Sequence, residues 1–216
     1  MSFKQELFDH LARIGKAVGQ GHRLAILEYL AQGERSVEVL AQLSGLSVAN
    51  TSKHLQQLRH AGLVHARKEG LYVHYRLSDP EIITLLGVIR RLSERHLAEV
   101  ETLVRNYLLA KDDMEPLPRT TLLERMREGT VTVLDVRPHE EYQAGHLPRS
   151  FNIPLRELER RLHELPPDRE VVAYCRGAYC VLSFEAVARL RKEGFKARRL
   201  EEGFPEWQKA NLPVEL

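Results

Sequence analysis

Two cysteines are all that the 216-residue sequence contains, and they lie five residues apart, at positions 175 and 180. A pair so close together cannot hold a secreted fold in shape, which excludes a disulfide-rich scaffold. No apolar stretch approaches the ~20 residues of a membrane span. The first residues, MSFKQELFDHL, also lack the apolar core of a signal peptide. We expect a cytoplasmic protein with no membrane partner.

A break in the hydrophobic pattern divides the chain. Helical periodicity runs to Leu108, and the next segment, KDDMEPLPRT, carries charges and two prolines that end a helix. Beyond it, short β-rich runs at 131–134 and 171–174 alternate with helical segments, as in βαβ units around a parallel sheet. We predict two domains, a mainly α domain at 1–110 and an α/β domain at 119–216, joined by a linker at 111–118.

The segment 22–61 has the pattern of a helix-turn-helix. One helix is predicted at 22–32, and Ser36 and Ser47 are placed to cap the next two, the last of which ends at Ala61. In the last helix the positions spaced to face inward are Val48, Thr51, Leu55 and Leu58. Amide side chains can pair with adenine, and lysine can reach guanine or phosphate. The residues of this helix predicted to contact DNA are Ala49, Asn50, Ser52, Lys53, Gln56 and Gln57.

A predicted hairpin, 63–77, comes directly after this helix, with its turn at Lys68-Glu69-Gly70. A hairpin after a recognition helix makes a winged helix, whose basic tip lies along phosphates. Its predicted DNA contacts are Arg67, Lys68 and Arg76. Residues 35–78 hold six Lys or Arg against two Asp or Glu, which favours a polyanion partner. The alternative is a solvated basic face, or a helical hairpin without a role in DNA binding.

In the second half, Cys175 directly follows the predicted strand 171–174 and precedes a loop and an amphipathic helix. This order places the loop at the carboxyl end of the sheet, where α/β folds bind ligands. Loop amides and a helix N-terminus form an anion cradle, which together with Arg176 lowers the pKa of the thiol. We expect the thiolate to take the outer sulfur of a sulfane donor and hold it as a persulfide.

The residues of this loop also exclude two other kinds of cysteine enzyme. Phosphatases and arsenate reductases with a Cys-x5-Arg loop need an arginine at the position of Val181. Its guanidinium binds the oxyanion of the substrate, so the sequence excludes both activities. Cys180 has two interpretations, a packed small hydrophobic side chain or a thiol that attacks the Cys175 persulfide. Packing is favoured, because strain in so small a ring opposes a bridge.

The segment SVEVLAQLSGLSVANTSKHLQQLRHAGLVHARKEGLYVHYRL resembles the ArsR family of winged-helix repressors, over about residues 5–108. The resemblance implies a homodimer that binds a palindromic double-stranded DNA operator and leaves it when a ligand binds. The dimer surface would be the N-terminal helix and one long helix from Pro80 to about Leu108. The seam of that long helix is predicted at Ile82, Leu85, Ile89, Leu92, His96, Val100, Leu103 and Tyr107. This region contains no cysteine for thiolate metal sensing, so we expect no metal, with His96 and Glu99 as weak candidate ligands.

Three separated motifs of the second half resemble the rhodanese sulfurtransferases, over about residues 117–214. They are the strand end at 134–137 with Gly-His-Leu-Pro at 145–148, the Cys175 loop, and LEEGFPEW at 200–207. The resemblance implies Cys175 as the persulfide-bearing nucleophile and no cofactor beyond that covalent persulfide. It implies that Asp135 and Arg137 order the neighbouring loop. The anion cradle would be the amides of Arg176, Gly177, Ala178, Tyr179 and Cys180. Departures at Arg149 and within the loop leave the donor open between thiosulfate and a low-molecular persulfide.

Together these patterns predict a DNA-binding transcriptional regulator whose rhodanese-like domain, a sulfurtransferase, couples sulfur status to transcription. The alternative is a sulfurtransferase enzyme whose winged helix serves mainly for dimerisation or targeting. The polar outward face of the recognition helix favours the regulator.

Overall fold

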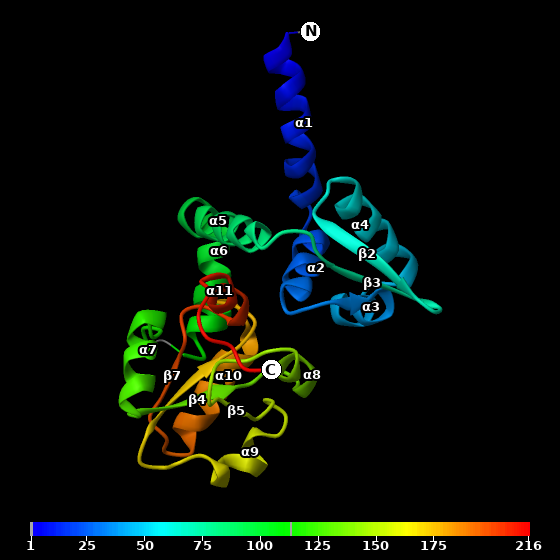
Figure 1. Cartoon of the computed structure of the whole chain (residues 1–216). Helices are drawn as coiled ribbons and strands as arrows, with labels where there is room; N and C mark the ends of the chain where they lie inside the picture. The colour runs from blue at the N-terminus through cyan, green and yellow to red at the C-terminus, as the bar shows by residue number, and fades with distance from the viewer. Residues whose placement is uncertain (1, 113) are drawn as a thin grey trace. The chain divides into compact units, whose positions relative to one another are not determined.

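The computed structural model describes residues 2–112 and 114–216 and divides them into two compact units, one up to Ile89 and one from Arg90 onward (Figure 1). The division falls inside helix α5 (Glu81–His96), earlier than the boundary expected near 110. Residues 90–110 therefore group with the second unit. The linker expected at 111–118 includes residue 113, which lies outside the described residues.

The first unit is the predicted winged helix-turn-helix. The side chains of Ser36 and Ser47 cap α3 and α4, and Gly45 ends α3 in the left-handed conformation that glycine adopts without strain. Strands β2 and β3 form the predicted hairpin, and β1 pairs with β3 in an antiparallel sheet of order β1-β3-β2. The elements are α1 (Phe3–Val18), α2 (Gly21–Ala31), β1 (Arg35–Ser36), α3 (Val37–Ser44), α4 (Val48–His60), β2 (Val64–Glu69) and β3 (Tyr72–Leu77).

One core holds these elements together, and it includes Ile26 of α2, Leu40 of α3 and Ile82 of α5. From α4 it takes the predicted inward positions Leu55 and Leu58, and Thr51 is also fully buried. Val48 was wrongly predicted to face inward. It is 48% exposed, because the helix begins there and its first turn projects beyond the core.

The predicted long helix to Leu108 is wrong beyond His96. The backbone of Leu97 is extended (φ −116°, ψ 103°), which separates α5 from α6 (Ala98–Leu103) and from a π-helical turn at Val104–Leu109. The predicted seam therefore does not form one face, since a break in the backbone changes the helical phase of the residues after it. Ile82 is buried, whereas Leu92, Leu103 and Tyr107 are exposed.

The weak metal candidates His96 and Glu99 are both exposed and lie on opposite sides of this break. Within residues 2–112 and 114–216, no group of three or more His, Cys, Asp or Glu side chains is arranged to hold a metal ion. Nor does this part of the chain contain a helix both long and apolar enough to cross a membrane.

The second unit is an α/β domain around a parallel sheet of order β5-β4-β6-β7. Strands β4 and β6 confirm the runs predicted at 131–134 and 171–174. The elements are α7 (Arg119–Glu128), β4 (Val131–Asp135), α8 (His139–Gln143), β5 (Phe151–Asn152), α9 (Leu158–Arg161), a 3-10 turn (Leu162–Glu164), β6 (Glu170–Tyr174), α10 (Val181–Lys192), β7 (Ala197–Arg199) and α11 (Phe204–Lys209).

Successive residues of β6 enter different cores, because side chains alternate across a strand. Val171 and Ala173 pack with Cys175 against α9 and α10. Val172 and Tyr174 pack on the other face with Leu122 of α7 and Trp207 of α11. In Figure 1 the strands β4, β6 and β7 run side by side within this unit, with α10 on one face. The alternation places the Cys175 side chain on the α10 face.

The segment expected to be a linker is packed against the second unit. The buried carboxylate of Asp112 accepts hydrogen bonds from Arg191, at 2.7 Å, and from the buried Arg199. Further on, the Leu117 amide donates to the Arg199 carbonyl at 2.7 Å. Residues on both sides of position 113 therefore belong to the folded domain.

Asp112→Ala is expected to destabilise the second unit by about 3 kcal/mol, because it leaves two guanidinium groups at a buried site without their carboxylate. Trp207 is the chain's one tryptophan and is buried in this unit, so its fluorescence during a urea titration reports the loss. Glu201→Ala, which removes an exposed carboxylate next to β7, is the control. Equal urea midpoints for the two variants would contradict the stabilising role of the Asp112 ion pairs.

Candidate functional site

The exposed face of α4 carries most of the residues predicted to contact DNA. Ala49, Asn50, Lys53 and Gln56 are exposed, and Ser52 is partly buried. A cap at Ser47 fixes where this face begins, since its hydroxyl accepts from the Asn50 amide. The arrangement presents two amides and one ammonium group on consecutive turns of one helix, which suits the edges of bases and their phosphates.

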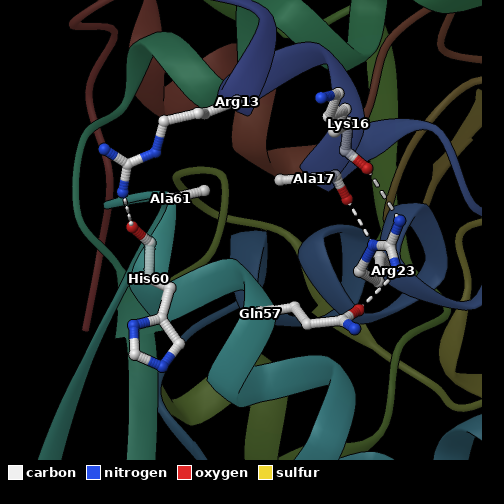
Figure 2. Close-up of a pocket in the computed structure, with 7 residues that line it drawn as sticks. All are labelled: Arg13, Lys16, Ala17, Arg23, Gln57, His60 and Ala61. Carbon is white, nitrogen blue, oxygen red and sulfur yellow. Dashed lines mark hydrogen bonds between the residues drawn. The ribbon is translucent and has the colours of Figure 1, made fainter. Parts of the chain in front are cut away.

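Gln57, which is also predicted to contact DNA, has a hydrogen-bond partner within the protein. Its Oε1 accepts from Arg23 at 2.6 Å. The same guanidinium donates to the carbonyls of Ala17 and Lys16 at the end of α1. Figure 2 shows Arg23 between these partners. Gln57 therefore joins α4 to Arg23 of α2, and Arg23 in turn supplies donors to the last carbonyls of α1.

These bonds border a cavity of about 330 Å³ in the first unit, drawn in Figure 2. A second guanidinium, that of Arg13, donates across it to the His60 carbonyl at 3.0 Å. The cavity is lined by Arg13, Lys16, Ala17, Arg23, Gln57, His60 and Ala61. Its two arginines are thus occupied in holding α1 against α2 and α4.

On the wing, the predicted DNA contact Arg67 also has partners within the protein. Arg67 binds Glu34 at 2.6 Å and Glu69 at 2.8 Å, and its hydrogen bond holds the pKa of Glu34 below the ordinary value. Its charge is therefore offset by two carboxylates. Lys68 and Arg76 are exposed and remain the predicted phosphate contacts of the hairpin.

Cys175 lies where predicted, directly after β6, but its state differs from the expectation. The structure joins it to Cys180 in a disulfide with the Cα atoms 6.2 Å apart, and Cys175 is 1% exposed. We predicted an accessible thiolate and favoured packing alone for Cys180. Cys180 does pack against the same core as Cys175, and it is also the partner of that residue. In this oxidised form neither sulfur is a nucleophile.

The third sequence motif holds the Cys175 loop in place. The Phe204 amide donates to the Cys175 carbonyl at 3.0 Å. Gly203 lies so close that a Cβ atom there would stand 2.3 Å from the Gly177 nitrogen, so this position requires glycine for steric reasons. Within the loop the Cys180 amide donates to the Gly177 carbonyl at 3.1 Å. That amide is therefore not free for the predicted anion cradle.

Arg176, which is predicted to lower the pKa of the thiol, is paired with a carboxylate of the protein. Its guanidinium binds the buried carboxylate of Glu141 on α8 through Nη2 at 2.7 Å and Nε at 3.0 Å. A bidentate pair of this kind fixes the guanidinium plane. Glu141 was missed as a site residue, because nothing in the local sequence of α8 distinguishes it from the exposed Glu140 next to it.

Asp135 and Arg137 form a fully buried ion pair at the end of β4, with Nη2 and Oδ2 2.7 Å apart. Arg137 also donates to the Gly145 carbonyl at 2.8 Å, and the Tyr174 hydroxyl bonds Asp135. Burial raises the pKa of Tyr174 well above its ordinary value. The pair thus ties the Gly-His-Leu-Pro segment to the end of β4.

Tyr179, in the middle of the Cys175 loop, has a partner on α5. Its hydroxyl donates to Glu94 Oε1 at 2.5 Å, and the guanidinium of Arg90 lies 5.8 Å from its ring centre. Burial and the bond to Glu94 raise the pKa of the phenol. The three residues belong to the second unit. The contact was not predicted, because Glu94 and Tyr179 are 85 residues apart in sequence.

A cavity of about 400 Å³ lies at the carboxyl end of the same sheet. Val136, directly after β4, and Leu182, in the first turn of α10, form part of its wall, and Arg156 and Arg189 supply positive charge. It is lined by Val136, Pro138, Glu140, Pro154, Leu155, Arg156, Leu182 and Arg189. Because Leu182 comes two residues after Cys180, this space adjoins the helix that leaves the loop.

Comparison with known proteins gives matches to both halves. The family model of a helix-turn-helix domain matches residues 18–67, and that of a rhodanese-like domain matches 119–210. The HTH-type transcriptional regulator Rv0324 of Mycobacterium tuberculosis is 46% identical over 98% of this chain and 93% of its own length. A sulfurtransferase of Allochromatium vinosum is 32% identical over 39% of this chain and 78% of its own.

Among solved structures, the homodimeric winged helix-turn-helix DNA-binding domain of Mb0332 from Mycobacterium bovis is 40% identical. The match covers 45% of this chain and 90% of that domain, with a TM-score of 0.42.

Proposed function

The chain belongs to the HTH-type transcriptional regulators of the ArsR type that carry a rhodanese-like domain, and from that premise we propose that it adjusts its binding of double-stranded DNA to the sulfane-sulfur load of Cys175. The reduced protein binds its operator as a homodimer. Uptake of sulfur at Cys175 then lowers the affinity for that operator.

The DNA-binding part of the proposal is supported by the exposed face of α4. Asn50, Lys53 and Gln56 point away from the core of the first unit, and their chemistry fits base edges and phosphates. The exposed Lys68 and Arg76 of the hairpin add two positive charges for the backbone.

The homodimer is supported by the first helix. An apolar face of α1 is exposed in the single chain, and burying such a face against a second copy would be favourable. Its exposed apolar residues are Phe3, Leu7, Phe8 and Leu11. The winged-helix relative from Mycobacterium bovis is a homodimer.

The sulfur chemistry is supported by the position of Cys175 at the end of β6 and by the likeness to a sulfurtransferase. The reaction requires the reduced loop, since the disulfide has no free thiolate. The Cys175 thiolate attacks the outer sulfur of thiosulfate, the bond between the two donor sulfurs breaks, and sulfite leaves with its electron pair. Cys175 then carries the outer sulfur as a persulfide anion.

The proposed coupling between the Cys175 loop and DNA binding rests on helix α5, which has contacts in both units. Its first turn places Ile82 in the core that also holds α4. Three turns later, Glu94 of the same helix accepts a hydrogen bond from Tyr179 in the Cys175 loop. A change in the loop that moves Tyr179 therefore acts on a helix that also belongs to the core of the DNA-binding unit.

The test is an anisotropy titration of a labelled duplex selected from random-sequence DNA by the reduced full-length protein. Wild type and Cys175→Ser are each titrated with and without thiosulfate. The proposal expects thiosulfate to weaken wild-type binding by about tenfold, within the usual range of coupling between sites, and to leave Cys175→Ser unchanged. Affinity that ignores the donor in both proteins would instead support an enzyme whose winged helix serves for dimerisation or targeting.

Tyr179→Phe is expected to reduce the effect of thiosulfate on DNA affinity to less than about twofold, because the phenyl ring keeps its packing but cannot donate to Glu94. The same anisotropy titration measures it, at an equal fraction of chains whose Cys175 loop has reacted, as read by mass spectrometry. Tyr107→Phe, which removes a hydroxyl from an exposed tyrosine outside the loop, is the control. A donor effect as large in Tyr179→Phe as in wild type would refute this route.

A further inference from the structure

We infer that Cys180 is a resolving thiol, which attacks the Cys175 persulfide, releases hydrosulfide and closes the disulfide seen in the structure. The site thereby acquires a further activity, the reduction of sulfane sulfur to sulfide at the expense of the two loop thiols. This inference rests on the proposed uptake of sulfur at Cys175.

The geometry of the loop places the two sulfurs next to each other. Cys175 and Cys180 are bonded to each other, five residues apart in sequence and with their Cα atoms 6.2 Å apart. The turn between Gly177 and Cys180 and the close approach of Gly203 hold the intervening backbone. An attacking group held this close reacts at a far higher effective concentration than a thiol in solution.

Cys180 is held at the start of a helix. It occupies the N-cap of α10, a helix of 12 residues, and its side chain makes no capping hydrogen bond within the described residues. The partial positive charge at a helix N-terminus stabilises negative charge beside it. The Ser183 hydroxyl donates to the Cys180 carbonyl at 2.9 Å, which holds the first turn of α10.

Atoms and electrons balance in this step. The Cys180 sulfur attacks Sγ of Cys175, the bond from Sγ to the outer sulfur breaks, and the outer sulfur leaves with the electron pair and takes the Cys180 proton. The products are the Cys175–Cys180 disulfide and hydrosulfide. Two thiol sulfurs are oxidised and one sulfane sulfur is reduced to sulfide. A dithiol reductant then reopens the loop by thiol–disulfide exchange.

The loop thus passes through three states, dithiol, persulfide and disulfide. In the disulfide Cys175 is 1% exposed and bonded, so this state takes up no further sulfur until it is reduced. Each reduction of the loop therefore permits the release of one sulfide.

The experiment uses full-length wild type, Cys180→Ser and Cys175→Ser, reduced and freed of reductant without oxygen, then treated with thiosulfate. Intact mass and released sulfide are measured together. Wild type is expected to lose about 2 Da as its disulfide closes and to release one sulfide per chain. Cys180→Ser is expected to hold a gain of about 32 Da, one sulfur atom. Its sulfide release should fall at least about tenfold, because the intramolecular attack is lost.

Two outcomes separate this inference from the proposed function. If wild type and Cys180→Ser both retain the added sulfur and release equally little sulfide, the resolving role is overturned while uptake at Cys175 stands. If neither protein takes up sulfur or releases sulfide, the proposed function is overturned and this step with it. The wild-type protein also tests the resolving role by itself, even if the variants do not fold. Two free thiols must disappear for each sulfide released, and samples without thiosulfate must keep both thiols.

Discussion

Cys175→Ser is expected to abolish the transfer of sulfur from thiosulfate to cyanide by the reduced protein, with a rate at least about 10³-fold below that of wild type. A serine hydroxyl is nearly the same size but stays protonated at neutral pH, so it neither attacks the outer sulfur nor holds it. The site is an interior position at the end of β6, where Ala173 and Val187 share one core with the side chain. Thiocyanate formation, measured through its iron complex, gives the rate.

The control for this loss is Cys180→Ser, which removes the other sulfur of the same loop. Under the resolving role of Cys180 this variant keeps the persulfide and passes it to cyanide, so its rate should equal or exceed that of wild type. A Cys175→Ser protein that retained a rate near that of wild type would place the nucleophile elsewhere in the chain.

Replacing both Asn50 and Lys53 by alanine is expected to weaken DNA binding about 100-fold, which corresponds to the loss of one amide contact to a base and one ionic contact to phosphate. Both side chains are exposed on the first two turns of α4. The two single variants should affect different properties of DNA binding. Asn50→Ala relaxes the choice of sequence, whereas Lys53→Ala weakens all sequences and reduces the salt dependence by about one unit of slope.

Gln57→Ala is the matched control on the same helix. Its side chain is committed to Arg23 on the side of α4 that faces α1 and α2, so its loss should leave DNA affinity within about twofold of wild type, since it removes no contact to DNA. Anisotropy titrations of the selected duplex measure all of these proteins. An effect of Gln57→Ala as large as that of the double variant would show that the DNA-binding face of α4 has been assigned to the wrong residues.

The sequence was most informative where local chemistry decides the structure. Ser36 and Ser47 begin helices because their hydroxyls satisfy backbone amides of the first turn. The apolar run of β6 forms a central strand because both of its faces are covered. These signals were enough to predict the winged helix, the parallel sheet and the place of Cys175.

Pairs formed over long separations could not be predicted from the sequence. The partners Arg23 and Gln57 are 34 residues apart, and Arg67 and Glu34 are 33 apart. Each charged or amide side chain has several candidate partners, and only the packed fold selects one. The partners of Gln57, Arg67 and Arg176 within the protein were missed for this reason. The break at Leu97 was missed because the apolar spacing continues across it, although the helical backbone does not.

The disulfide was not predicted for a different reason. The two cysteines lie close in sequence, and a small hydrophobic side chain in a helix cap explains Cys180 as well as a partner thiol does. Only the backbone path from Cys175 to the start of α10, which brings the Cα atoms to 6.2 Å, distinguishes the two. Separations of this size are the ones that disulfides span.

The most direct test of the whole account is native mass spectrometry of the full-length protein mixed with its selected duplex, part-way through reaction with thiosulfate. This measurement reads the state of the Cys175 loop and the occupancy of DNA on the same molecules. We predict that chains with the reduced dithiol loop are enriched in the DNA-bound population, and that chains with persulfide or disulfide are enriched in the free population. The same distribution of loop states in both populations would contradict the claim that sulfur at Cys175 controls DNA binding.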